Sequence, residues 1–283
     1  MDKQLFIKPK DLSLKVSSQN NLKIIDSTFY LPGSDLIAKN EYDKKHIPNA
    51  VFFDINNIAD PDNSLPHMIP SKELFSEMMS DLGLNNEDDI VIYDNSPLLS
   101  SARAWFLFRY FGFEKISILP GGLNNWTKSG GEVTDKVTLI SKGNFTANKE
   151  RKELVVSLNQ MINVSKNINS TILDARSYKR FTGEANEPRP GLSSGHIPNS
   201  KSLPSSDLIN NDGYLKSLNE LNSIFSKGKF SVNDDIIATC GSGVSACVIA
   251  IALFCMGKSD VTIYDGSWTE WASSGQEIVK GGE

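Results

Sequence analysis

Four short blocks occur twice along the chain, in the same order and with similar spacing. The repeated features are two short apolar runs that end in a polar residue or cysteine, a His-Ile-Pro-Asn turn and a tryptophan-containing ending. The four pairs are residues 22–27 with 171–176, 46–50 with 196–200, 89–94 with 235–240, and 116–126 with 261–271. Chance similarity does not preserve order and spacing in this way. A period this long therefore indicates two duplicated domains, because a solenoid repeats over far fewer residues.

Within each half, short β-rich runs alternate with amphipathic helical patterns. Residues 71–82 form one such helix pattern, with Ser71 as a good N-cap and Gly83 as a plausible stop, and residues 101–111 form another. Strands that alternate with helices predict an α/β fold in which each domain has a mostly parallel sheet flanked by helices.

We expect the domains to cover residues 1–138 and 154–283. Polar and charged residues outnumber apolar ones between them, so residues 139–153 are predicted to be the linker.

Composition excludes several classes of protein. The 283 residues are 39% hydrophobic and 22% charged, as in ordinary globular proteins, and the net charge of −5 gives no reason to expect a nucleic-acid partner. Three cysteines do not make a disulfide framework and favour a reducing compartment. The first residues lack the pattern of a secretory signal, and no apolar run is long enough to span a membrane, so we expect a cytoplasmic location.

One stretch of the second half, residues 236–247, predicts a reactive cysteine. An apolar strand ends at Cys240, a glycine-spaced loop follows, and residues 244–254 have the apolar character of a buried helix. Gly241 and Gly243 let the backbone curl so that several amides aim at one point. A helix N-terminus favours an anion, and such a site lowers the pKa of a thiol. The alternative interpretation is an inert buried cysteine beside an ordinary turn.

The first half provides an internal control, since Asp94 stands where the second half has Cys240. His46 and His196 occur in both halves, although only one half has a cysteine, so we interpret them as structural. His67 has no counterpart. It lies in a proline-rich segment that could reach across to the cysteine of the other half, or it is a loop histidine without a role.

The second half has its own insertion, residues 178–191, which follows its first strand and contains Arg180 and Arg189. A guanidinium group can bind a carboxylate bidentately. The alternatives are solvated surface charges, or ion pairs with Glu184 and Glu187.

Three of these features resemble the tandem-domain rhodanese family over nearly the whole chain: Cys-Gly-Ser-Gly-Val-Ser at 240–245, the two His-Ile-Pro blocks, and Tyr-Asp-Gly-Ser-Trp at 264–268. The first run is similar to the Cys-Gly-Ser-Gly-Val-Thr signature of 3-mercaptopyruvate sulfurtransferases, with Ser245 in place of threonine. The thiosulfate-using branch has arginine and lysine at the positions of Gly241 and Ser242. Thiosulfate is a dianion that calls for cations in the loop.

The resemblance implies a role for each matching position. Cys240 is the nucleophile, and Ser242 and His67 match the serine and histidine of a serine-protease-like triad. The third member, an aspartate in the family, falls at Asn56, which can orient an imidazole but cannot stabilise an imidazolium by charge; Asp54 is an alternative. The expected substrate-binding residues are the two arginines and the loop positions: Arg180, Arg189, Gly241, Gly243, Val244 and Ser245.

The implied activity is sulfur transfer from 3-mercaptopyruvate through a persulfide on Cys240, with release of pyruvate. Thioredoxin, another dithiol or cyanide is the expected acceptor, and no metal or organic cofactor is needed. Three alternatives stay open: a thiosulfate sulfurtransferase, a non-catalytic sulfur-binding scaffold, and a phosphatase on a related fold. The phosphatase is the weakest, because position 246 is alanine where such enzymes need an arginine.

Overall fold

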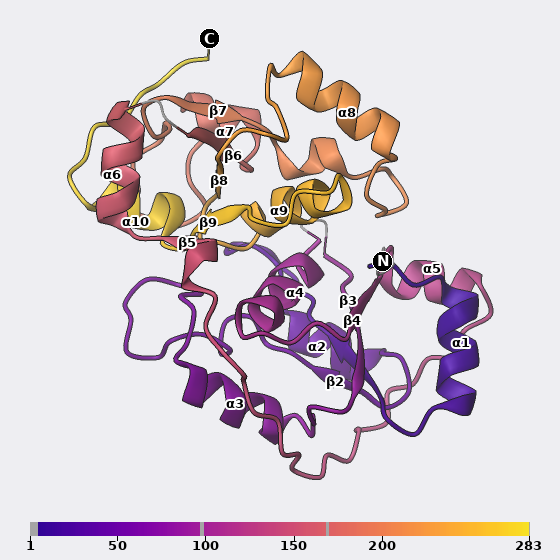
Figure 1. Cartoon of the computed structure of the whole chain (residues 1–283). Coiled ribbons are helices and arrows are strands. Elements are labelled where there is room, and N and C mark those ends of the chain that lie inside the picture. The colour runs from indigo at the N-terminus through magenta and orange to yellow at the C-terminus, as the bar shows by residue number, and fades with distance from the viewer. Residues whose placement is uncertain (1–4, 97–98, 168–169, 283) are drawn as a thin grey trace. The chain divides into compact units, whose positions relative to one another are not determined.

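The computed structural model describes residues 5–96, 99–167 and 170–282, and it separates into two compact units (Figure 1). The first unit comprises Met1–Asp60, Ile69–Arg151 and Asn211–Tyr214. The second comprises Pro61–Met68, Lys152–Asn210 and Leu215–Glu283. Each unit therefore takes a short segment from the other half of the sequence. The linker at 139–153 and the domain boundaries beside it stay a prediction.

The first unit contains a four-stranded sheet in which every pair of neighbouring strands is parallel, with the order β2-β1-β3-β4. Its strands are β1 (Leu22–Asp26), β2 (Ala50–Phe52), β3 (Asp89–Tyr93) and β4 (Ile116–Leu119). Its helices are α1 (Pro9–Ser18), α2 (Ala38–Lys44), α3 (Lys72–Asp81), α4 (Ser101–Tyr110) and α5 (Gly122–Lys128).

The second unit contains a five-stranded parallel sheet with the order β5-β9-β8-β6-β7. Its strands are β5 (Val155–Val156), β6 (Thr171–Asp174), β7 (Ser200–Ser202), β8 (Ile236–Thr239) and β9 (Thr262–Tyr264). Its α-helices are α6 (Leu158–Asn167), α7 (Tyr178–Thr182), α8 (Leu218–Lys227), α9 (Ala246–Cys255) and α10 (Ser267–Ser273). Two 3₁₀ turns, η1 (Lys152–Leu154) and η2 (Ser205–Leu208), complete it.

The two sheets share one register. In the first unit Asp26 of β1 pairs with Phe52 and Tyr93, and in the second Asp174 of β6 pairs with Ser202 and Thr239. The repeated sequence blocks therefore occupy matching strands, and the counterpart of β5 in the first unit is the isolated parallel bridge between Phe6 and Ile118. The predicted α/β fold, with a parallel sheet and helices in each domain, is confirmed.

The predicted helices are present with small changes at their ends. α3 begins directly after Ser71, whose side chain accepts a hydrogen bond from the Leu74 amide, and Gly83 follows with φ of 77°. α9 begins at Ala246, two residues later than predicted, because the loop turns at Gly243 in the left-handed region (φ 77°) before the chain becomes helical. In the described part of the chain, every helix is too short or too polar to cross a membrane.

His46 and His196 have equivalent surroundings, which supports their interpretation as structural residues. Both rings are buried, and their Nδ1 atoms lie 2.7 Å from the Tyr42 carbonyl oxygen and 2.9 Å from the Phe181 carbonyl oxygen. Each ring also stacks on that partner's ring, at centroid distances of 4.2 and 3.8 Å. These contacts fix the turn before β2 and before β7.

The buried aspartates at the ends of β1 and β6 differ in their partners. Asp174 ion-pairs with Arg176, whereas Asp26 has Thr28 at the matching position and accepts from the Thr28 amide and hydroxyl. Burial raises the pKa of Asp26 from 3.8 to about 6, and the Thr28 hydrogen bonds offset only part of that effect. A group whose pKa is raised on folding contributes stability that is present at low pH and is lost as the pH rises through the folded pKa.

We therefore expect Asp26→Asn to stabilise the first unit relative to the parent as the pH rises from 4 to 7.5, by up to about 3 kcal/mol. The amide keeps an acceptor oxygen for Thr28 and carries no charge to bury. The measurement is hydrogen exchange in peptides that cover β1 and β3, compared between variant and parent at each pH. Asp35→Asn, at an exposed site in the same unit, is the control. A difference that does not change with pH would contradict the assignment.

Candidate active site

Cys240 follows β8 directly, at the carboxyl end of a central strand of the second sheet, and only 1% of its surface is exposed. α9, which follows the loop, is apolar and buried over most of its length, so the loop rests on the interior of the unit. Two of the first amides of α9, those of Cys247 and Val248, donate to the Val244 and Ser245 carbonyls. The positive end of the α9 dipole makes the buried loop a favourable setting for a sulfur anion.

The start of α10 holds this loop in place. The Trp268 amide donates to the Cys240 carbonyl (2.9 Å), and the Thr269 amide and hydroxyl both donate to the Gly241 carbonyl (3.0 and 2.7 Å). These bonds fix the backbone on either side of the thiol. In the second unit, the repeated block at 261–271 therefore holds the cysteine loop.

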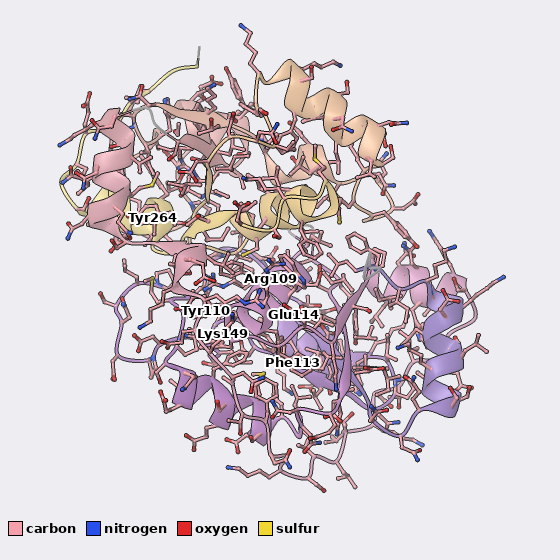
Figure 2. All side chains as sticks on the ribbon, in the orientation of Figure 1. Arg109, Tyr110, Phe113, Glu114, Lys149 and Tyr264 are labelled. Carbon is pink, nitrogen blue, oxygen red and sulfur yellow. The ribbon has the colours of Figure 1, made fainter. Side chains whose placement is uncertain are left out.

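Ser267 is the most constrained residue of the site. Its φ is 51°, an uncommon conformation for a residue with a side chain, and it is fully buried. Its Oγ accepts from the Cys240 amide (3.3 Å) and the Gly243 amide (3.0 Å) and lies 4.0 Å from the Cys240 Sγ. The hydroxyl proton points to the Tyr264 carbonyl, at 2.8 Å; Figure 2 labels Tyr264. The first half has Gly122 in this place, with φ of 52°.

His67 and Ser242 lie together in the second unit, although 174 residues separate them in the sequence. The segment Pro61–Met68 belongs to that unit, His67 is buried, and its Nδ1 lies 2.9 Å from the Ser242 Oγ and 3.3 Å from the Ser242 carbonyl oxygen. With the proton on Nε2, Nδ1 accepts from the hydroxyl; with the proton on Nδ1, the ring donates to Ser242. Both arrangements place a proton-carrying pair two residues from the thiol.

Asn56 belongs to the first unit, so its predicted place beside His67 stays a prediction. Its amide donates to Asp54 Oδ1 at 3.0 Å. Asp54 Oδ2 in turn accepts from the Asn57 side chain at 2.7 Å. Asp54, the alternative third member, is therefore bound within its own turn.

Arg180 ends a chain of buried ion pairs. Its Nε and Nη2 bind the two Glu187 oxygens at 3.2 and 2.5 Å, and Glu187 Oε1 also accepts from Arg176 Nη1 at 2.8 Å. Arg176 is bound in turn to Asp174. Burial by itself lowers the pKa of Arg176, but the charges of Asp174 and Glu187 outweigh burial and raise it. The ion pair with Glu187 was one of the alternatives that the sequence left open, and it is present.

Arg189 differs from Arg180, because no carboxylate in the described part of the chain binds it. Burial lowers the pKa of Arg189, and its charged neighbours are Cys240, Arg180 and Glu187. Arg180 also lies close to the loop, since a Cβ added to Gly241 would come 3.0 Å from its Nη2. The insertion thus brings two guanidinium groups to the cysteine loop, one tied to Glu187 and one unneutralised.

The substrate-binding roles expected for Val244 and Ser245 stay a prediction, and the other two cysteines pack in the interior. Val244 is buried, and Ser245 is the N-cap residue of α9 without a capping side-chain bond. Cys247 is fully buried and its Sγ lies 3.3 Å from the Gly243 carbonyl. Cys255 is partly buried, and burial raises its pKa to about 11, so it stays a thiol near neutral pH. Cys240 is the cysteine at the loop.

The matching loop of the first unit contains the carboxyl group of Asp94. The Asp94 carboxylate accepts from the Ser96 amide and hydroxyl (3.1 and 2.9 Å) and from the Ser101 amide (2.9 Å). Burial raises the pKa of Asp94, and these bonds offset part of that rise. Residues 97–98 of this loop lie outside the described residues. The carboxylate therefore takes hydrogen bonds from loop and helix-start amides, the kind of donor expected to stabilise a sulfur anion at Cys240.

Sequence reasoning missed Ser267, Arg176 and Asp174, and it named Glu187 only as an alternative partner. A signal was present for Ser267, because the repeat aligns it with Gly122 and a change from glycine to serine at a left-handed position is unusual. The ion-pair chain had no comparable signal, since its members are common charged residues. In the described part of the chain, no three His, Cys, Asp or Glu side chains gather to hold a metal ion.

The chain is similar in sequence and in structure to several named sulfurtransferases. Thiosulfate/3-mercaptopyruvate sulfurtransferase 1, mitochondrial, from Arabidopsis thaliana is 40% identical over 89% of this chain and 72% of its own length. 3-Mercaptopyruvate sulfurtransferase from Escherichia coli (strain K12) is 40% identical over 89% of both chains. The crystal structure of SseA from Escherichia coli superimposes with a TM-score of 0.85 at 36% identity, over 94% of this chain and 99% of that one.

The family described as Rhodanese-like domain matches the chain twice, over residues 9–129 and 155–274, which together cover most of its length. Each match contains the four core strands of its sheet: β1 to β4 in the first, and β6 to β9 in the second. The chain therefore belongs to the rhodanese family and carries two rhodanese-like domains, of which the second has the cysteine loop.

Proposed function

We propose that the protein is a sulfurtransferase that takes sulfur from 3-mercaptopyruvate onto Cys240 and passes it to a thiol. The observation that carries this proposal is the 2.9 Å contact between the Ser242 Oγ and the His67 Nδ1, two residues from the thiol. Breaking the carbon–sulfur bond of 3-mercaptopyruvate leaves an enolate, which needs a proton. Release of sulfite from thiosulfate needs none. A proton-carrying pair at this place favours the first donor.

In the first half-reaction the Cys240 thiolate attacks the sulfur of the donor and forms an S–S bond. The donor's carbon–sulfur bond breaks, its electron pair moves into the pyruvate enolate, and the sulfur keeps its proton as the Cys240 persulfide. Ser242 donates a hydrogen bond to the enolate oxygen, with His67 as its proton source. Protonation of the enolate carbon completes pyruvate. Loop amides stabilise the persulfide when it ionises.

The donor's carboxylate is held by the two arginines of the insertion. Arg189 has no carboxylate partner of its own in the described part of the chain, and it is a charged neighbour of Cys240. The Arg180 Nη2 lies beside Gly241 of the loop, and Nη2 and Nε also bind Glu187. Arg189 is therefore expected to contribute more to binding, because Glu187 already neutralises much of the Arg180 charge.

In the second half-reaction a thiolate attacks the outer sulfur and leaves with it, which returns Cys240 as a thiolate. We propose thioredoxin or another dithiol as the acceptor, with cyanide as an artificial one. The cytoplasmic location predicted from the sequence stays a prediction, since one relative is named as mitochondrial. Asn56 is proposed as the third member of the triad, beside His67 and Ser242. Its amide can orient the imidazole but cannot balance an imidazolium charge.

A non-catalytic scaffold is the main alternative, and a direct test separates it from an enzyme. Incubation with 3-mercaptopyruvate should add one sulfur atom to the peptide that contains Cys240, seen by mass spectrometry. Cys240→Ser should abolish this addition and turnover while leaving the fold intact, because the change is nearly isosteric and oxygen is a poor sulfur acceptor. The control is Cys247→Ala with Cys255→Ala, which should keep most of the activity. Loss of activity in that folded double variant would exclude Cys240 as the sole nucleophile.

Thiosulfate is the second candidate donor, because one relative is named for both donors. Gly241 and Ser242 supply no cations, so we expect kcat/KM to favour 3-mercaptopyruvate over thiosulfate by at least tenfold. Gly241→Arg with Ser242→Lys should reverse this order, because it adds two cations and removes the hydroxyl. The added side chain at 241 must displace the Arg180 end group. Equal efficiency of the parent on both donors would contradict the argument from loop charge.

The carboxylate clamp predicts a loss that depends on the donor. Arg189→Ala should lower kcat/KM for 3-mercaptopyruvate roughly tenfold to a hundredfold, since a charge-assisted hydrogen bond contributes ~1.5–3 kcal/mol. Arg189→Lys should keep more of kcat/KM than Arg189→Ala but less than the parent, because lysine keeps the charge and loses the planar fork. A small neutral persulfide donor should react with variant and parent alike. An equal loss on both donors would mean that Arg189 supports the loop and does not bind substrate.

Glu187 provides the control on Arg180 in the same experiment. Glu187→Gln removes the charge that holds the Arg180 fork, and we expect a raised KM for 3-mercaptopyruvate with a smaller change in kcat. In an Arg180→Ala background the same change should add little, because the group it positions is gone. Glu184→Gln, three residues away and exposed, is the matched control and should leave kcat/KM unchanged.

A further inference from the structure

The second unit has a groove away from the cysteine loop, with a volume of about 750 Å³. It is bordered by β7, the end of α6, α7 and the last residues of the chain. Figure 1 shows the yellow C-terminal segment passing α6. None of the proposed catalytic or clamp residues lines it, so it is a separate feature of the unit.

The groove is basic in a protein whose net charge is −5. Lys166 at the end of α6, Lys201 in β7 and Lys280 in the C-terminal segment all line it. In the part of the chain that the structure describes, none of the three is ion-paired with a carboxylate. Glu277 is the one acidic residue among the described lining residues. Three cations on three separate elements suit a ligand that carries several negative charges along its length.

One wall of the groove is the edge of a sheet. β7 is the last strand in the order β5-β9-β8-β6-β7, and it pairs with β6 on one side only. On that side the Leu203 amide donates to the Asp174 carbonyl. All three residues of β7 line the groove, and the buried Ser202 Oγ has no hydrogen-bond partner. A sheet edge can take up an extended chain through main-chain hydrogen bonds.

The floor of the groove is aromatic. The Tyr178, Phe181 and His196 rings form a stack, and the Lys201 Nζ lies 5.6 Å from the centre of the Phe230 ring. Trp271, which is buried, also lines the groove. Such a floor accommodates apolar side chains between the charged ones of a bound peptide.

We propose that this groove binds an extended acidic segment of a partner protein, which adds to the free edge of β7 while its carboxylates meet Lys166, Lys201 and Lys280. Charge complementarity and an unpaired strand edge support this assignment. It does not depend on the donor proposed above, because the groove and the cysteine loop share no residue. A lysine in an edge strand also discourages pairing with neutral strands, which makes acidic segments the favoured partners.

The test uses the full-length protein and a fluorescein-labelled peptide of alternating glutamate and valine, followed by fluorescence anisotropy. We expect binding that weakens as salt rises, and an affinity loss of about tenfold or more in Lys201→Glu. Lys216→Glu, outside the groove, is the matched control and should bind as the parent does. Arg189→Ala should also bind as the parent does, which separates this site from the cysteine loop. Circular dichroism of each variant checks that it is folded.

Two further probes test the nature of the ligand. A peptide of alternating glutamate and proline keeps the carboxylates but removes half of the amide donors, and it should bind at least tenfold more weakly. Pyrophosphate should not compete at concentrations near the peptide affinity. The proposal is overturned if the parent does not bind the peptide, if Lys201→Glu binds as well as the parent, if the proline peptide binds equally, or if pyrophosphate displaces the peptide fully.

Discussion

The parallel pairing of two central strands decides where chemistry can occur in this protein. In each unit the strand that ends in a buried aspartate pairs with the strand that ends directly before position 94 or 240. Parallel strands end at the same edge of a sheet, so the loops that follow them meet there. In the second unit this edge receives Cys240 from β8 and, from the segment after β6, Arg176 and the insertion. The catalytic proposal depends on this one arrangement of strands.

The two halves show how one fold supports both a reactive and an unreactive loop. In the first, Asp94 places its own carboxylate among the loop amides. In the second, Cys240 occupies that position, and Ser267 replaces the glycine at a left-handed turn beside it. A Cβ on Gly122 would come within 2.2 Å of the Asp94 carbonyl oxygen, so the first loop excludes a side chain there. The conformation of Ser267 is unfavourable by itself, and its bonds to the Cys240 and Gly243 amides offset that cost.

The buried charges of the second unit form a chain of ion pairs. Asp174, Arg176, Glu187 and Arg180 alternate in sign, so each buried charge has an opposite neighbour. Ion pairs of this kind add little net stability, because desolvation offsets their attraction. Their effect is geometric: they hold the fork of Arg180 against Gly241 and leave Arg189 as the unneutralised cation. In the first unit, where Thr28 replaces Arg176, the matching Asp26 has a raised pKa.

The sequence by itself determined the duplicated α/β fold, the strand–loop–helix around Cys240 and the absence of a nucleophile from the first half, because these depend on local periodicity and on comparison between the two halves. Only the tertiary structure decided which distant residues meet. The placement of His67 against Ser242 depends on a segment that joins the other unit. The ion pair between Arg180 and Glu187 was one of several pairings that the sequence allowed. Such contacts form between elements that are far apart in the chain. The free energy of each pairing depends on its burial and geometry, which are set by tertiary packing and not by the neighbouring residues in the sequence.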